Sequence, residues 1–518
     1  TWKGPTQVKY PADDLGAAGD PVIAFDRNGI AYIAQISVDI EEFTVRNVVG
    51  DSAVTSIPIA RSTDGGITWS EPIVAADSHI DTSPAVEDSD GRITYEVLIP
   101  FLDKPWVAIG PSRENPENDI IYVTYTKFLT RYPLFFLFDV EAFQLVPTTE
   151  TSIELVKSED GGLTWSEPVT ISDVVTSTLG EDQTKRVVQG SQPGVAPDGT
   201  VYVTWVDSTD DNSFEGRAEI YVAKSTNDGE DFTKTLASEF GEIPFSPRNT
   251  FFRYWGSTFP QISIGPYGEV YITYTSKPPD KETDDGDIYF LVSNDQGKTW
   301  DRKRLNDDKT NRLQFFPSVS AGPDGTLHAM WGDMRDDPVE TRYHIYYTSS
   351  EDGGETWIEN ARVTDFPSNP NYAFPGGAFI GDYFTIASTT DEVYMAWPDA
   401  RLGEFGPDNQ KIAFARKGLM PLPSIFLSPP SGPGGKDITI QGSNFQPDQD
   451  VFLEISGAVV STVRSDPDGR FTARIFIPIS GEGAHDFRAI DASGNIATGS
   501  FFMDFGFDTI QEAVVEIM

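Results

Sequence analysis

The stretch SEDGGLTW, at Ser158–Trp165, decides how this sequence folds, because the same pattern returns four more times. The other copies are RSTDGGITW from Arg61, KSTNDGEDF from Lys224, VSNDQGKTW from Val292 and SSEDGGETW from Ser349. The copy from Lys224 departs from the pattern, with Asn227 in place of Asp and Asp231–Phe232 in place of Thr–Trp. In this pattern, Ser-x-Asp-x-Gly-x-Thr-Trp, short Asp and Ser side chains can accept hydrogen bonds from a tight turn. Glycine supplies left-handed backbone, and tryptophan offers a large packing face. Regular self-similarity of this kind predicts a repeat architecture.

A second recurring unit comes before each copy of the pattern and reads as two strands joined by a turn. QPGVAPDGTVYVTW from Gln192 and FPQISIGPYGEVYITY from Phe259 are examples. The alternation in TVYVTW has period two, which predicts strands, and PDG or PYG predicts a tight turn. Six copies occur, beginning at Asp20, Lys104, Gln192, Phe259, Phe316 and Gly381.

The Ser–Asp–Gly pattern resembles the Asp-box, or BNR repeat, of sialidase-like β-propellers, and the resemblance covers residues 1 to about 419. It implies an all-β fold, a six-bladed sialidase-like β-propeller over residues 1–419. In that family the box joins the third and fourth strands of a blade, on the face opposite the active site. We therefore expect the boxes to be scaffold. Their residues are Ser62, Asp64, Gly66, Trp69, Ser158, Asp160, Gly162, Trp165, Asn227, Gly229, Phe232, Asp295, Gly297, Trp300, Asp352, Gly354 and Trp357.

The sixth copy of the unit has three strand patterns and no box after them. The chain opens with TWKGPTQVKYP, Thr1–Pro11, which matches the end of a box and the residues after it in the other repeats. This match predicts that the N-terminus supplies the outer strand of the last blade. Such pairing would close the ring and remove its open sheet edges.

A Pro/Gly-rich boundary, LMPLPSIFLSPPSGPGG, starts at Leu419. Beyond it, short alternating strands between turns predict a β-sandwich over residues 420–505. SPPSGPGGKDITIQGSNF, from Ser428, resembles the opening of an Ig-like or IPT-type module of prokaryotic surface proteins. In the tail, 506–518, Thr509 and Glu512 form a capping-box pattern that predicts a helix. The tail could dock on its own chain, meet a partner, or begin a longer segment.

Composition excludes several functions. The 518 residues include no cysteine, four histidines, 80 acidic residues and 38 basic ones, for a net charge of −42. Thiol chemistry and cysteine zinc sites are excluded, and such a surface repels nucleic acid and anionic membranes. No apolar run reaches the roughly 20 residues of a membrane span. We expect a secreted or cell-surface protein without an organic cofactor, although the acidic surface could serve solubility alone.

Candidate ligand-binding residues end the second strand of several repeats. They are Asp333 with Arg335 and Asp399 with Arg401. An alternative is that these pairs only pin loops. The sialidase resemblance implies three substrate-binding arginines, an Asp acid/base and a Tyr–Glu pair. The chain reads AGDPVIAF where the family has Arg-Ile-Pro, so Arg248, Arg253, Arg335 or Arg401 would have to replace that arginine.

Two aromatic insertions and three acidic loops complete the candidates. TRYPLFFLFDVEAFQLV from Thr130 and FGEIPFSPRNTFFRYWGST from Phe240 are predicted to contact a partner or to cap the ring. Their interface candidates are Phe135, Phe136, Phe138, Phe251, Phe252 and Trp255. Weak Ca²⁺ sites are candidates at Asp207, Asp210, Asp211, Asp284, Asp285, Asp336 and Asp337.

The sequence favours a non-catalytic extracellular protein that acts in assembly, adhesion, or glycan or protein binding, with self-assembly as an option. The alternative is a sialidase-type or divergent exo-glycoside hydrolase. The missing Arg-Ile-Pro motif favours the first over the second.

Overall fold

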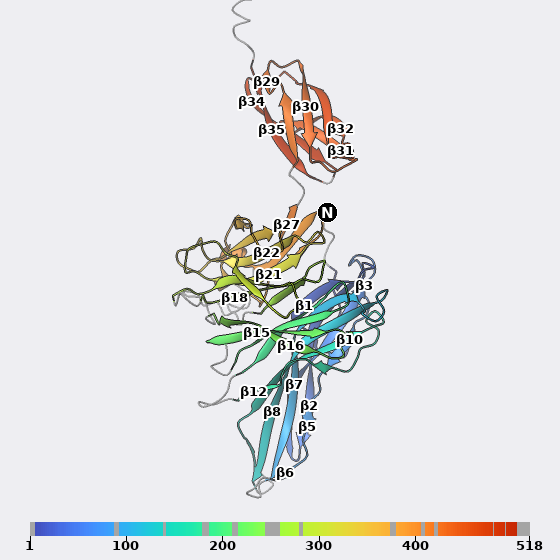
Figure 1. The fold of residues 1–518 in the computed structure, drawn as a ribbon, viewed down its shortest axis with the longest axis vertical. Coiled ribbons are helices and arrows are strands. Elements are labelled where there is room, and N and C mark those ends of the chain that lie inside the picture. The colour runs from blue at the N-terminus through green and yellow to red at the C-terminus, as the bar shows by residue number, and fades with distance from the viewer. Residues whose placement is uncertain are drawn as a thin grey trace, which may run out of the picture. The chain divides into compact units, whose positions relative to one another are not determined.

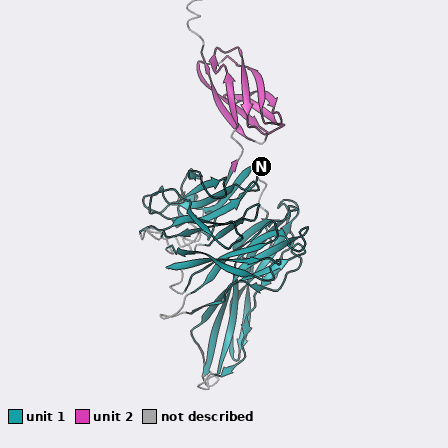
Figure 2. Ribbon diagram, in the orientation of Figure 1, with its two compact units in different colours: residues 1–416 teal, residues 417–518 magenta. Residues whose placement is uncertain are grey.

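The structure is a computed structural model of the chain. It describes residues 6–87, 93–137, 141–178, 186–209, 216–243, 259–278, 283–372, 380–405, 410–418, 423–479, 481–492 and 494–504. These residues form strands and two 3₁₀ turns, η1 (Pro370–Tyr372) and η2 (Arg401–Phe405), and they contain no α-helix. The all-β prediction is confirmed for them. The chain divides into two compact units, Thr1–Arg416 and Lys417–Met518 (Figure 2).

The described part of the first unit forms six sheets that follow one another along the chain (Figure 1). Sheet 1 holds β1 (Gly16–Phe25), β2 (Ala31–Val45), β3 (Val48–Ser62) and β4 (Ile73–Asp77). Sheet 2 is built on β7 (Ile93–Pro111), β8 (Asp119–Leu137) and β10 (Thr148–Ser158), with the short strands β5 (Asp81–Thr82), β6 (Val86–Glu87), β9 (Glu141–Gln144), β11 (Val169–Thr170) and β12 (Val175–Thr178). Sheet 3 holds β13 (Val188–Val195), β14 (Val201–Asp207), β15 (Arg217–Ser225) and β16 (Thr233–Gly241).

The other three sheets share the same plan. Sheet 4 holds β17 (Gln261–Ile264), β18 (Val270–Ser276), β19 (Asp287–Ser293) and β20 (Asp301–Arg304). Sheet 5 holds β21 (Gln314–Ala321), β22 (Leu327–Asp333), β23 (His344–Ser350) and β24 (Ala361–Arg362). Sheet 6 holds β25 (Thr385–Ser388), β26 (Glu392–Asp399) and β27 (Lys411–Gly418). In sheets 1, 3, 4 and 5 the spatial order of the strands is their chain order, as in a meander.

Successive sheets pack face to face. One buried cluster joins sheets 1 and 2 and includes Ile59 and Val123, and the next joins sheets 2 and 3 and includes Leu155 and Trp205. Two more clusters join sheets 3 to 4 and 4 to 5. Strands such as β14, VYVTWVD, are buried along their whole length, because both faces of each sheet meet a neighbour.

The boxes form the hairpins between third and fourth strands. In the second box, Ser158 Oγ accepts from Gly162 N at 2.9 Å, and Asp160 accepts from Thr164 N at 2.9 Å. These bonds, Thr164 foremost, lower the pKa of Asp160 to about 2. Trp165 packs against the core between sheets 1 and 2. The hairpin of the second box is thus closed by its own side chains.

Sheets 1 and 2 extend beyond the others through long hairpins (Figure 1). The insertion predicted at Thr130 is not a loop over its first half, because β8 continues to Leu137 and pairs with β7. Phe136 is 7% exposed and packs with Val45 and Val97, while Arg46 lies 5.4 Å from its ring centre. Phe136 is therefore buried within its own unit, and Phe135 is half-buried beside it.

The second unit has two sheets. One holds β28 (Ser424–Ser428), β30 (Asp437–Ser443) and β33 (Phe471–Phe476). The other holds β29 (Ser431–Gly432), β35 (Ile496–Met503), β34 (Gly483–Asp491), β31 (Asp450–Ile455) and β32 (Ala458–Arg464). A single buried cluster, which includes Ile440 of one sheet and Leu453 and Phe487 of the other, fills the space between them.

Candidate functional site

Asp–Arg pairs end the second strands of sheets 5 and 6, where the sequence predicted them. Asp333 Oδ1 accepts from Arg335 N at 2.8 Å, and Asp333 Oδ2 accepts from Arg335 Nε at 2.9 Å. The same two bonds join Asp399 to Arg401, at 2.8 and 2.6 Å. An aspartate that accepts a hydrogen bond from the backbone N–H two residues later forms a local turn. This turn fixes the position of the arginine relative to the end of the strand.

These guanidinium groups also have partners on the preceding sheet. Arg335 donates to Asp307 at 2.7 Å, and its guanidinium carbon lies 4.3 Å from the Tyr346 ring centre. Arg401 donates to Asp365 at 3.0 Å. The carboxylates and hydrogen bonds around Arg335 raise its pKa although burial opposes this. Both arginines therefore hold neighbouring sheets together.

A second group of polar side chains lies within the first strands of sheets 1, 2 and 3 and just before the first strand of sheet 6, and the sequence did not predict it. This strand-start cluster consists of Asp20, Asp103, Lys104, Gln189, Asp382 and Tyr383. Lys104 Nζ lies 2.5 Å from Asp382 Oδ2 and 5.0 Å from the ring centre of Phe259. Gln189 donates to Asp103 at 2.8 Å. The Tyr383 hydroxyl donates to Asp20 at 3.2 Å.

Local backbone geometry positions this cluster. Asp20 and Lys104 take left-handed φ values of 48° and 52°, where the registers of β1 with β2 and β7 with β8 shift. Non-glycine residues occupy this region at a cost, which is often met at functional sites. Tyr383 is fixed further by an edge contact with Trp106, at 5.1 Å between ring centres.

Burial dominates the electrostatics of the strand-start cluster. It raises the pKa of Asp382 to about 6 despite Lys104 beside it, and it also raises the pKa of Asp103. Burial alone would lower the pKa of Lys104, but Asp382, Asp103 and Asp20 together raise it. A carboxyl group with a pKa near neutrality can give or take a proton. The cavity it lines with Tyr383 is only about 10 Å³, room for roughly one water molecule.

Other predicted residues lie apart from this cluster or outside the described residues. Asp207 forms two bonds with Arg186, at 2.8 and 2.6 Å. Asp336 accepts from Tyr346 at 2.8 Å, and Asp337 accepts from backbone N–H groups of its own loop. Asp284 and Asp285 are buried before β19. The predictions at Arg248, Arg253, Phe138, Phe251, Phe252, Trp255, Asp210, Asp211 and the tail lie outside the described residues.

The described residues contain neither a metal-binding cluster nor a helix able to span a membrane. No group of three or more His, Cys, Asp or Glu side chains within them is arranged to hold a metal ion. No helix in the same part of the chain has the length and hydropathy to cross a bilayer.

One signal in the sequence could have indicated the strand-start cluster. Five of the six first strands carry X-Pro, and the residues before proline include Asp20 and Lys104. In the sixth copy Asp382–Tyr383 stands at the same position. Aligned repeats place equivalent residues at equivalent positions of neighbouring sheets. Acidic and basic residues at this one aligned position therefore indicate that their side chains contact one another.

Comparison with known proteins agrees with the repeat analysis. Residues 148–379 match the family model for a BNR repeat-like domain, and residues 60–71 match that for the BNR/Asp-box repeat. The chain therefore contains BNR repeat-like sequence, as predicted. No curated protein sequence matches it.

Among solved structures the fold is similar to sialidase and arabinanase β-propellers. The leech intramolecular trans-sialidase has 13% identity and a TM-score of 0.43, with 80% of this chain and 70% of that one covered. The NanB sialidase of Streptococcus pneumoniae has 11% identity and a TM-score of 0.43, with 80% and 71% covered. The α-L-arabinanase of Penicillium chrysogenum has 16% identity and a TM-score of 0.37, with 79% and 96% covered.

Proposed function

We propose that this chain is a non-catalytic, secreted or cell-surface binding protein whose sialidase-like first unit presents a surface to a glycan or protein. The observation that carries the proposal is the pairing of the candidate arginines. Arg335 and Arg401 each hold two carboxylates of their own chain, at 2.6–3.0 Å. Recruiting either one for a substrate carboxylate would leave buried Asp333 or Asp399 unpaired, a cost of about 3–5 kcal/mol for a buried pair.

The proposed architecture is a six-bladed propeller over residues 1–419, closed by the N-terminal segment, then an Ig-like sandwich over 420–505 and a tail at 506–518. Outer strands contact the box of the next sheet: Thr235 donates to Gly297 O at 3.0 Å, and Lys303 donates to Gly354 O at 2.9 Å. Thr6 donates to Ile67 O, in the first box, at 3.4 Å. The N-terminal segment thus makes the same kind of contact with the first box that an outer strand makes with the box of the next sheet. Residues 6–11 form no strand, and Thr1–Pro5 lie outside the described residues.

A glycoside hydrolase is the alternative, and one observation favours it. Asp382, with a pKa of about 6, lies beside Tyr383 and Lys104 in the strand-start cluster. A carboxyl group of raised pKa suits a general acid. Against this, Asp382 is 6% exposed and its cavity holds about one water molecule, so a sugar ring would need the site to open.

Turnover measurements decide between these functions. Purified protein is assayed with fluorogenic sialosides, arabinofuranosides and common hexosides from pH 4 to 8. We expect no turnover above that of Asp382→Asn. Hydrolysis that Asp382→Asn or Arg335→Ala abolishes, with melting temperature retained, would replace the binding proposal by the hydrolase.

A further inference from the structure

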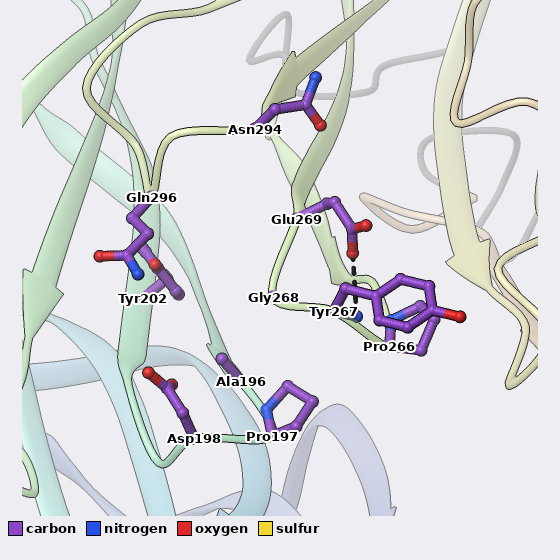
Figure 3. Close-up of a pocket in the computed structure, with 10 residues that line it drawn as sticks. All are labelled: Ala196, Pro197, Asp198, Tyr202, Pro266, Tyr267, Gly268, Glu269, Asn294 and Gln296. Carbon is purple, nitrogen blue, oxygen red and sulfur yellow. Dashed lines mark hydrogen bonds between the residues drawn. The ribbon is translucent and has the colours of Figure 1, made fainter.

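A groove of about 460 Å³ opens between sheets 3 and 4, at the end of the sheets that carries the boxes (Figure 3). Its walls are the β13–β14 turn at residues 196–198, the β17–β18 turn at residues 266–269, and the box loop at Asn294 and Gln296. These turns meet because the first and third hairpins of a four-stranded meander emerge at the same end. The Asp–Arg pairs lie at the opposite ends of their sheets.

Tyr202 lines this groove. The residue is 1% exposed overall. Burial raises the pKa of Tyr202 to about 12, so the group keeps its proton at neutral pH and can donate. The Tyr202 hydroxyl can therefore donate a hydrogen bond to an acceptor oxygen of a ligand in the groove.

The polar groups around Tyr202 are held in place before any ligand binds. Asp198 accepts from Thr200 N at 3.0 Å and from Arg113 at 2.9 Å. Burial opposes ionisation of Asp198, but these bonds outweigh it and keep its pKa below the usual value. Gln296 Oε1 accepts from Lys224 at 2.7 Å, which leaves the Gln296 amide N–H groups to donate. Such preorganisation lowers the entropy cost of binding.

Glu269 lies on the wall opposite Asp198 and Gln296, and in Figure 3 its carboxylate points toward Tyr267. One of its oxygens accepts from Tyr267 N at 3.0 Å, which fixes the carboxylate and leaves the other oxygen to accept. Gly265 makes room for it, because a Cβ there would lie 2.4 Å from Glu269 Oε2. Tyr267 itself is 88% exposed, and its ring stands beside Pro266 with the hydroxyl turned away from the groove.

We propose that this groove binds a neutral saccharide, an inference that rests on the binding function proposed above and names its ligand class. Each sugar hydroxyl can donate to the carboxylate of Asp198 or Glu269 and accept from Gln296 or Tyr202, and charge-assisted bonds of this kind are the strong ones. Two carboxylates on facing walls repel an anionic sugar. A volume of about 460 Å³ lies within the usual range for small-molecule sites.

An equivalent groove between sheets 2 and 3 provides the internal control. It measures about 340 Å³ and lies between the β7–β8 turn and the third box. Its groups are already paired with each other: Asp228 accepts from Ser112 at 2.7 Å and from Arg113 N at 2.6 Å. Glu230 accepts from Lys157 at 2.6 Å. Because Glu230 is already paired with Lys157, Glu230→Gln is a matched control for Glu269→Gln.

The test is calorimetry and ligand-observed NMR of the full chain with lactose, cellobiose and arabinobiose, and with 3′-sialyllactose as the anionic probe. We expect at least one neutral disaccharide to bind in the millimolar range or tighter, and 3′-sialyllactose to bind more weakly than lactose. Glu269→Gln and Tyr202→Phe should each weaken binding about tenfold, because one carries a charged and the other a buried hydrogen bond. Glu230→Gln should leave binding unchanged.

The failures are distinguishable. Saccharide binding that survives Glu269→Gln and Tyr202→Phe would overturn the groove and leave the binding function standing. Binding of 3′-sialyllactose in preference to lactose would overturn the neutral ligand class. Release of monosaccharide during the titration would overturn the non-catalytic function itself. No binding by any of the three neutral probes would also overturn the inference. A Glu230→Gln variant that reduces binding as much as Glu269→Gln would overturn it too, because the effect would then come from surface charge.

Discussion

Replacing Lys104 by Met should destabilise the first unit strongly at neutral pH. Lys104 is the one cation of the strand-start cluster, and it faces the carboxylates of Asp20, Asp103 and Asp382. It is 7% exposed and Asp382 is 6% exposed, so water cannot take its place. Removing one member of a buried ion pair costs about 3–5 kcal/mol. At about 2.1 cal/mol/K per residue over unit 1, this corresponds to a loss of roughly 3–6 °C in melting temperature.

The pH dependence follows from Asp382. Its pKa rises from an ordinary 3.8 to about 6 on folding. A raised carboxyl pKa contributes stability that is fully present below the unfolded value and is lost as pH rises through the folded value. The contribution is about 3 kcal/mol at 1.36 kcal/mol per pKa unit, and it is lost between about pH 4 and pH 6. Because Asp382 is protonated at pH 4.5, Lys104→Met should cost less there than at pH 7.

Calorimetric melting of the intact chain at pH 4.5 and pH 7 measures both effects. Asp382→Asn should be nearly neutral at pH 7, because it removes a carboxyl group that burial disfavours while Asp103 and Asp20 still face Lys104. Lys411→Met, at an exposed position of β27, is the control and should change nothing. Equal losses for Lys104→Met at both pH values, or an Asp382→Asn loss as large as that of Lys104→Met, would refute the reasoning.

Three further predictions test closure, the long hairpins and calcium. Deleting Thr1–Pro11 should lower the melting temperature of the first unit by several degrees, because sheet 6 loses its proposed outer strand; a change within about 2 °C would exclude closure. Phe136→Asp, at a 7% exposed position, should lower the free energy of unfolding by about 3 kcal/mol or more. Phe135 is half-buried, so Phe135→Asp should change self-assembly alone if that surface binds a partner. Melting measures the first effect and sedimentation measures the second. Calcium titration should give only weak binding, because Asp207 and Asp337 are already hydrogen-bonded; a single site with a Kd below about 10⁻⁷ M would contradict this.

The repeats could be predicted from the sequence because their determinants are local. The box places Ser158, Asp160 and Thr164 within seven residues, and the bonds that close the hairpin run between them. The Asp–Arg pairs were equally visible, since Arg335 stands two residues after Asp333. Because the hydrogen bonds of such a short pattern form between its own residues, the local sequence alone determines the shape of the turn.

The strand-start cluster could not be predicted in the same way. Lys104 and Asp382 are 278 residues apart, and only the packing of sheets brings them together. The long β8 strand was missed for another reason. Pro133 cannot donate a strand hydrogen bond and argues against a strand interior. In the structure Pro133 uses its carbonyl instead, which accepts from Leu145 N at 2.9 Å beside β9. The extension therefore depends on a partner strand that no local pattern reveals.

The excess of acidic residues explains why an uncharged ligand suits this chain. With 80 acidic and 38 basic residues, the chain has about two carboxylates for each cationic side chain, so a ligand carboxylate must compete with the protein's own carboxylates for a cation. At the second strand ends, Arg335 and Arg401 are already held by carboxylates of the preceding sheets. An anionic ligand must displace such a partner or enter against the field of the surface, and both lower its affinity. A hydroxyl group avoids both costs, because it can donate to the surplus carboxylates. The groove beside Tyr202, where ionised Asp198 keeps its partners and Glu269 keeps a free oxygen, is the described site that best fits this requirement.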